Sequence, residues 1–144
     1  MTDGAAVILL ANRRTANKLG CKILGRMVSF ATAGVPPKVM GIGPAFAIPK
    51  ALTNAGLTMD DIDVFEINEA FASQATYCVN QLKVPKEKLN PRGGALAIGH
   101  PLGMTGARMI VTLFSELERT NKKRGLVSMC IGTGMGACGI FERE

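Results

Sequence analysis

NPRGGALAIGHPLGMTGAR, residues 90–108, carries the strongest structural signal of the chain. It places His100, the only histidine, in a glycine-rich turn between an apolar run and a helix that starts near Thr105. Pro101 biases the residue before it towards an extended backbone, so His100 is not expected inside a helix. A neutral imidazole in such a turn can accept a proton or donate to a developing oxyanion. The pattern predicts a catalytic His100, with a purely structural histidine as the alternative.

Strand and helix signals alternate along the rest of the chain. We expect strands at residues 5–10, 23–31, 61–67, 95–98, 126–131 and 139–141, and helices at 14–19, from 44 or 49 to 55, at 70–82, and from 105 onward. Such alternation favours an α/β domain with a largely parallel sheet. The glycine turn after residue 131 favours a terminal antiparallel hairpin.

Composition and charge narrow the class of protein. With 144 residues, of which 47% are hydrophobic and 19% charged, the chain is long enough for one globular domain. The net charge of +6 comes from clusters that are either solvated faces or attract a polyanion. No aromatic residues are interleaved with these charges, which argues against nucleic-acid binding. The apolar run at residues 5–11 is too short for a membrane span and has the wrong flanking charges for a signal peptide, so we interpret it as a buried strand.

The four cysteines are Cys21, Cys78, Cys130 and Cys138. Their wide spacing predicts neither a CxxC pair nor a zinc cluster, and so no metal site. Free thiols without an export signal favour a reducing compartment. Cys130 ends an apolar run beside a glycine turn, where its thiol would be exposed and open to activation by a histidine. The alternative is a small buried apolar side chain.

Two further segments are open to more than one interpretation. Asn68 follows the predicted strand at residues 61–67, and its simplest role is that of a helix N-cap. Residues 132–137, GTGMGA, match a dinucleotide-binding fingerprint, but no helix follows them, so we reject that match. Their glycines instead predict a close backbone approach, or free N–H groups that face an anion.

Three motifs together resemble the C-terminal half of thiolases: NEAFA from Asn68, GGALAIGHPLG from Gly93 and CIGTGMG from Cys130. The resemblance covers nearly all of the chain and is greatest to the peroxisomal 3-ketoacyl-CoA thiolases. It implies one half of a five-layer α/β/α/β/α sandwich, with a mostly parallel five-stranded sheet, helices on both faces and a C-terminal antiparallel hairpin. Residues 1–22 would be a remnant of the last strand and helix of the N-terminal half, and residues 23–144 the C-terminal domain.

Thiolases cleave a 3-ketoacyl-CoA with CoA, as in fatty acid β-oxidation, through an acyl group held on a cysteine. The resemblance implies that His100 activates this nucleophile and donates to an oxyanion hole, and that Asn68 holds a water in the same hole. Cys130 would be the acid/base. The N–H of Gly132 would serve a second oxyanion hole, and Phe71 would line the pantetheine channel.

The resemblance also implies partners and a location. Acyl-CoA and CoA would be substrates, with no other cofactor, and the location would be peroxisomal, with mitochondria or cytosol as alternatives. The family's nucleophilic cysteine lies in the N-terminal half, so the chain alone should be inactive. An N-terminal half or a second copy should cover an exposed apolar face, and we expect neither nucleic acid nor membrane as a partner. Competing functions are a non-catalytic truncated fragment acting as a structural or dimerisation module, and a small thiol hydrolase with Cys130 as nucleophile and His100 as base.

Overall fold

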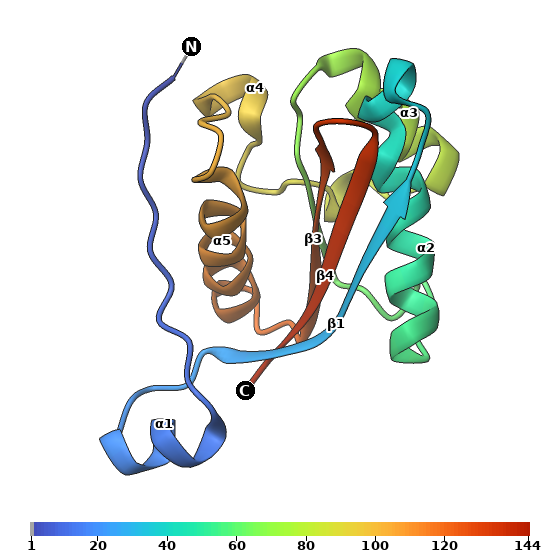
Figure 1. The fold of residues 1–144 in the computed structure, drawn as a ribbon. Coiled ribbons are helices and arrows are strands. Elements are labelled where there is room, and N and C mark those ends of the chain that lie inside the picture. Colours follow the sequence, from blue (N-terminus) through green and yellow to red (C-terminus); the bar gives the residue numbers. More distant parts are fainter. Residues whose placement is uncertain (1) are drawn as a thin grey trace.

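The computed structural model describes residues 2–144, which form one sheet with helices on both of its faces (Figure 1). The elements in chain order are α1 (Arg13–Leu19), β1 (Gly25–Gly34), η1 (Pro37–Ile42), α2 (Gly43–Ala55), β2 (Val64–Ile67), α3 (Ala72–Leu82), η2 (Lys86–Lys88), α4 (Ala95–Ile98), α5 (Thr105–Arg119), β3 (Arg124–Ile131) and β4 (Met135–Arg143). None of the helices within residues 2–144 has the length and apolar character needed to cross a lipid bilayer.

The sheet has four strands in the order β1-β4-β3-β2. β2 and β3 are parallel, whereas β3 and β4 form an antiparallel hairpin and β4 pairs antiparallel with β1. The α/β class, the helices on both faces and the C-terminal hairpin are therefore confirmed. The expected five-stranded, mostly parallel sheet is wrong in its details, because β1 joins the sheet beside β4 and leaves β2–β3 as the one parallel pair among the described strands.

Two cores lie on opposite faces of this sheet. Leu126 on β3 faces one core, where it packs with Phe65 and with Ile48 of α2. Its neighbour Val127 faces the other core, which includes Leu113 of α5. Successive residues of a strand point to opposite faces, so one apolar run supplies both cores. α5 contributes an apolar stripe at helical spacing, as the sequence predicts.

Two predicted strands are absent. Residues 5–10 form neither strand nor helix and run alongside the body of the molecule, with Val7, Leu9 and Leu10 more than 80% exposed (Figure 1). A strand needs a hydrogen-bonded neighbour, and no strand of residues 2–144 lies beside this segment. Residues 95–98 form the one-turn helix α4 instead, and in it the Leu96 N–H donates to the carboxylate of Glu69 at 3.0 Å.

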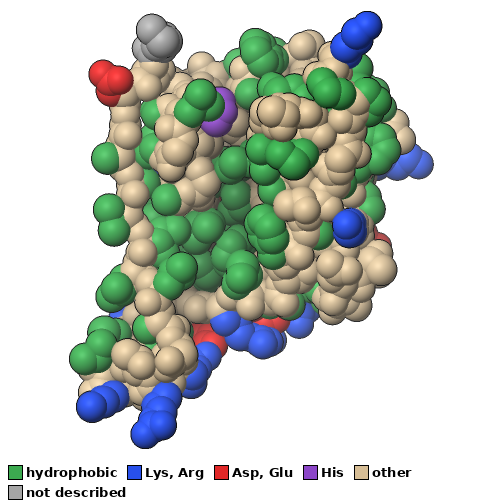
Figure 2. Space-filling view, viewed as in Figure 1, with side chains coloured by type: hydrophobic (Ala, Val, Ile, Leu, Met, Phe, Trp, Pro, Cys, Tyr) green, Lys and Arg blue, Asp and Glu red, His purple; other side chains and the backbone are tan. Residues whose placement is uncertain are grey.

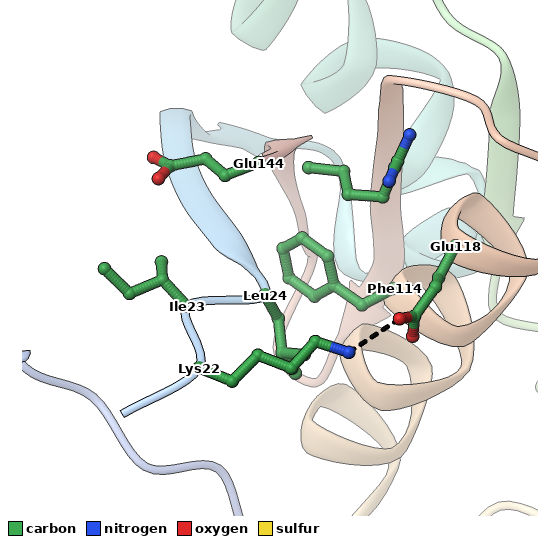
Figure 3. A pocket seen from close by; sticks show the side chains of 7 residues that line it. Lys22, Ile23, Leu24, Phe114, Glu118 and Glu144 are labelled. Carbon is green, nitrogen blue, oxygen red and sulfur yellow. Dashed lines mark hydrogen bonds and ion pairs between the residues drawn. The ribbon is translucent and has the colours of Figure 1, made fainter. Parts of the chain in front are cut away.

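Ion pairs hold the N-terminal part of the chain against the C-terminal part. Arg13 pairs with Glu144, and Lys22 pairs with Glu118 of α5 at 2.6 Å. Figure 3 shows the Lys22–Glu118 pair at the edge of a cleft that Phe114 also lines. The cleft holds about 20 Å³, room for little more than one water, so it is not a substrate site.

Candidate active site

The carboxyl ends of β2 and β3 meet at one edge of the sheet, because these strands are parallel and adjacent. Asn68 directly follows β2, and its backbone N–H donates to the Ser128 carbonyl at 2.9 Å, which continues the pairing by one residue. Cys130 is the next-to-last residue of β3. Asn68 and Cys130, predicted as site residues, thus lie at the ends of neighbouring strands.

The Asn68 side chain is buried without a use in the fold. It is 1% exposed, and neither its Oδ1 nor its Nδ2 has a hydrogen-bond partner among residues 2–144. The N-cap interpretation is wrong, since α3 is capped at Phe71, whose N–H donates to Oε1 of Gln74 at 3.2 Å. A buried polar group without a partner costs about 1–3 kcal/mol. The amide of Asn68 is therefore suited to hold a water or ligand atom.

His100 lies in the turn between α4 and α5, half-buried, at the upper surface of the molecule (Figure 2). Its Nδ1 is 2.6 Å from the hydroxyl of Thr105, the first residue of α5, and that hydroxyl is 3.0 Å from the Pro101 carbonyl oxygen. The first turn of α5 lies over the end of β3, where a Cβ on Gly106 would be 3.4 Å from Cε of Met129. The turn that carries His100 therefore lies at the same edge of the sheet as the ends of β2 and β3.

Two side chains that the sequence did not single out join the Asn68 loop to the segment that carries His100. Asn90 holds the end of β2: its Oδ1 accepts the Ile67 N–H and its Nδ2 donates to the Ile67 carbonyl, both at 2.9 Å. Nδ2 also donates to Oε1 of Glu69 at 3.0 Å, and Oε2 of Glu69 accepts the Leu96 N–H of α4. A Cβ at position 94 would collide with this carboxylate, so Gly94 leaves the space it needs. We name this set, Asn90 with Glu69, the amide–carboxylate clamp.

The thiol of Cys130 is buried, whereas the sequence predicts that it is exposed. It is 8% exposed, and burial raises the pKa of the thiol. Cys130 is paired with Gly136 in the hairpin, and Gly136 packs so closely on Gly43 of α2 that a Cβ at 136 would collide with that backbone. A thiol with a raised pKa stays protonated at neutral pH, so it suits proton donation better than nucleophilic attack.

The other cysteines do not supply an activated thiol. Burial raises the pKa of Cys78, and that of Cys138 to about 12, whereas Cys21 is exposed after α1. Within residues 2–144, no three His, Cys, Asp or Glu side chains gather as a set of metal ligands.

Gly132 and Phe71 flank the edge. Gly132 starts the exposed turn after β3, and a Cβ there would meet nothing within 4 Å. Phe71 is 62% exposed and borders an open groove of about 380 Å³ between η1 and the start of α3. The groove is lined by Lys38, Val39, Met40, Gly41, Ile42, Phe71, Ser73, Gln74 and Tyr77. Its volume is in the range of small-molecule sites.

A buried ion pair lies beneath the edge. Glu66 of β2 is 1% exposed, and its Oε2 is 3.4 Å from Nη1 of Arg108 on α5. Burial raises the pKa of Glu66 to about 7, against the opposing effect of Arg108. The Oε1 atom has no hydrogen-bond partner within residues 2–144. This carboxyl group therefore titrates near neutral pH inside the fold.

Comparisons with known proteins identify the family of this chain. Residues 21–143 match the family model of the thiolase C-terminal domain. The human peroxisomal 3-ketoacyl-CoA thiolase is 64% identical over 143 residues, which cover 99% of this chain and 34% of that protein. The peroxisomal 3-ketoacyl-CoA thiolase of Saccharomyces cerevisiae is 57% identical over 144 residues, all of this chain and 34% of the relative.

Solved structures give the same relationship. The peroxisomal 3-ketoacyl-CoA thiolase of S. cerevisiae, a five-layered α-β-α-β-α structure built from two core domains of identical topology, superposes with a TM-score of 0.88 at 58% identity. That superposition covers 93% of this chain and 38% of the yeast chain. The acetyl-CoA acetyltransferase of Bacillus anthracis superposes with a TM-score of 0.89 at 42% identity, over 92% of this chain and 34% of its own. The chain spans about a third of the length of these relatives, and it belongs to the thiolase family as a C-terminal domain.

Proposed function

We propose that the chain is the C-terminal catalytic half of a peroxisomal 3-ketoacyl-CoA thiolase, which cleaves 3-ketoacyl-CoA with CoA in fatty acid β-oxidation. The observation that carries the proposal is the buried, unpartnered amide of Asn68 at the sheet edge that also holds His100 and Cys130. Relatives named as peroxisomal 3-ketoacyl-CoA thiolases are up to 64% identical to the chain, which supports both the substrate class and the location.

In this reaction a cysteine of the N-terminal half loses its proton to His100 and attacks the 3-keto carbon. The N–H of Gly132 stabilises the resulting oxyanion. The C2–C3 bond then breaks, and the leaving acetyl-CoA enolate has its oxygen stabilised by His100 and by a water on Asn68. Each such donor is worth roughly 2.7–4 kcal/mol.

Cys130 closes the proton balance. Its thiol protonates C2 of the enolate, which gives acetyl-CoA and a thiolate. The thiolate then takes the proton of the incoming CoA thiol, and the CoA sulfur attacks the acyl-enzyme. The shortened acyl-CoA is released as the cysteine of the N-terminal half leaves as a thiolate and takes its proton back from His100. Burial that raises the pKa of Cys130 favours the donor role. Acid/base catalysis of this kind contributes roughly 10²–10⁴ in rate.

The groove beside Phe71 is our candidate site for the pantetheine arm of the CoA substrate. Its lining is largely apolar, and Lys38 places a positive charge on it. CoA enters as a substrate, and we expect no further cofactor. Exhaustive dialysis against a chelator should then leave unchanged the thiolysis activity of an enzyme assembled with this chain. A loss of that activity that added metal restores would contradict this expectation.

The test is a chimera in which this chain replaces the corresponding part of the S. cerevisiae enzyme, which is 57% identical to it. The chimera should cleave acetoacetyl-CoA, and His100→Ala or Cys130→Ala should lower kcat at least about 10²-fold. Glu87→Gln on the exposed η2 is the matched control and should change nothing. The 144-residue chain alone should be inactive, since loss of a covalent nucleophile can cost roughly 10⁶ in rate. A folded but inactive chimera, or His100→Ala at full rate, would refute the proposal.

We also propose that another chain segment covers an apolar face of this one. Large hydrophobic side chains are exposed on the N-terminal segment and on α4, α5 and the turn between these helices, which Figures 1 and 2 show beside each other: Val7, Leu9, Leu10, Leu96, Ile98, Leu102 and Val111. Monomeric proteins rarely expose so many neighbouring apolar groups. The isolated chain should bind a hydrophobic dye and self-associate in sedimentation, and a monodisperse monomer without dye binding would contradict this.

The same face supports a second candidate, a non-catalytic structural or dimerisation module. A solved relative is the dimeric peroxisomal thiolase of S. cerevisiae, 58% identical over 93% of this chain. If the chimera assembles as the yeast enzyme does yet has no thiolysis activity, the module is the better description. A small hydrolase with Cys130 as nucleophile is disfavoured by the burial of that thiol.

A further inference from the structure

Thr105 lies between His100 and the backbone of the turn. It is the first residue of α5, its side chain is 2% exposed, and its hydroxyl makes two short contacts. One runs to Nδ1 of His100 at 2.6 Å and the other to the Pro101 carbonyl oxygen at 3.0 Å. A hydroxyl group carries a single proton, so it can donate in only one of these contacts.

The two possible arrangements are not equivalent. If the hydroxyl donates to Nδ1, the 3.0 Å approach between the Thr105 and Pro101 oxygens has no proton in it, and two lone-pair-bearing atoms face each other. If the ring donates from Nδ1, the hydroxyl is free to donate to Pro101, and both contacts are hydrogen bonds. The Pro101 carbonyl also accepts backbone N–H groups in the turn, so it does not need the Thr105 hydroxyl as a donor. The close approach of the two oxygens is therefore what favours the arrangement in which the ring donates from Nδ1.

We propose that Thr105 is a positioning residue that holds neutral His100 in the Nδ1–H tautomer and leaves Nε2 as the proton acceptor. The histidine nitrogen that carries the proton is set by the hydrogen bond the other nitrogen makes. Thr105 fixes the orientation of the ring as well as the tautomer, because its own side chain is buried and its hydroxyl is held by the helix start.

The consequence for catalysis rests on the proposed function. With Nδ1 protonated, one atom serves both roles of His100: Nε2 accepts the proton of the nucleophile, and Nε2–H then donates to the oxyanion. No ring flip is needed between these steps. In the opposite tautomer Nε2 already carries a proton and cannot act as the base.

The tautomer can be read without any activity, because His100 is the only histidine. In the ¹⁵N-labelled chain at about pH 8.5, where an ordinary imidazole is neutral, two-bond ¹H–¹⁵N spectra should show a protonated Nδ1 and an unprotonated Nε2. Thr105→Val, of nearly the same shape, should shift the ring to a mixture of tautomers, and Thr105→Ser should keep the wild-type pattern. A protonated Nε2 in the wild-type chain overturns the inference, as does a Val variant that matches the wild type.

A kinetic measurement separates this inference from the proposed function. In the yeast chimera, Thr105→Val should lower kcat about 10- to 100-fold with little change in KM, by analogy with the loss of the partner that orients a metal-bound histidine. Thr105→Ser should restore most of the rate, which a merely structural role for the γ-methyl group would not allow. An inactive chimera with Thr105 present refutes the proposed function, whereas the NMR tautomer decides the role of Thr105.

Discussion

Replacing Asn90 should lower the free energy of unfolding by more than the loss of one ordinary side chain does. Asn90 is 9% exposed and holds the end of β2 and the Glu69 carboxylate through three hydrogen bonds. Its backbone is left-handed, with φ at +41°. Asn90→Gly removes the hydrogen bonds and tolerates this backbone, whereas Asn90→Ala removes the hydrogen bonds and adds backbone strain. The two variants therefore separate the side-chain contribution from the backbone contribution.

The magnitude follows from the partners. Two bonds to the Ile67 backbone are worth about 0.5–1.5 kcal/mol each, and the bond to the Glu69 carboxylate about 1.5–3. We therefore expect Asn90→Gly to lower the free energy of unfolding by about 2.5–6 kcal/mol. Asn90→Ala should lower it by roughly 0.5–1 kcal/mol more, because the strain of a left-handed alanine exceeds the entropy that glycine loses on folding.

Urea denaturation followed by far-UV circular dichroism measures both losses. Asn121 is the matched control: it is also left-handed, with φ at +52°, but exposed, so Asn121→Gly should cost less than about 1 kcal/mol. If Asn90→Gly stays within about 0.5 kcal/mol of the wild type, or costs no more than Asn121→Gly, the amide–carboxylate clamp does not stabilise this edge.

Three further outcomes are expected. Burial raises the pKa of Glu66 from 4.5 to about 7, so between these pH values the native state binds a proton that the unfolded state does not. The free energy of unfolding should therefore fall by about 3 kcal/mol as pH rises from about 4.5 to 7. Glu66→Gln should flatten this dependence in urea titrations, and an unchanged slope would contradict the assignment. Iodoacetamide at neutral pH should label exposed Cys21 well before buried Cys130, as mass spectrometry can show, and equal rates would disprove the burial of that thiol. Gly136→Ala should lower the melting temperature, because the new Cβ meets the backbone of α2 at a cost of about 1–3 kcal/mol or more. Gly132→Ala is the control: its Cβ lies in open space and should leave the melting temperature nearly unchanged. Equal effects of the two substitutions would refute the close packing.

The sequence predicted elements whose pattern is local. α5 carries its apolar residues at helical spacing, and its predicted start at residue 105 is the observed one. The hairpin of β3 and β4 follows from two apolar runs around a glycine turn. Residues 95–98 were predicted wrongly as a strand, because four apolar residues fit either structure. In the helix that they form, the Leu96 N–H donates to a carboxylate from 27 residues earlier in the chain, a partner that no local pattern reveals.

The candidate site also contains residues that the sequence predicted and residues that it did not. Asn68, His100 and Cys130 could be named from the sequence through the resemblance, and the structure brings their segments to one edge. Asn90 and Thr105 were missed, because they act through other groups: one on the end of β2, the other on the imidazole. A histidine followed five residues later by a hydroxyl at a helix start was the available signal for Thr105. The left-handed backbone of Asn90 leaves no such mark in the sequence.

The edge of the sheet combines groups that lower stability with groups that restore it. A buried amide without a partner at Asn68 destabilises the fold, and nothing among residues 2–144 compensates for it at that atom. At the same edge the clamp fixes the end of β2 and Thr105 holds the His100 ring, all through hydrogen bonds of 2.6–3.0 Å. Packing alone would favour an apolar side chain at position 68. An unsatisfied amide at a buried sheet edge is expected where a reacting oxygen or a water must be bound in one place, which is why Asn68 carries the proposal of a catalytic function.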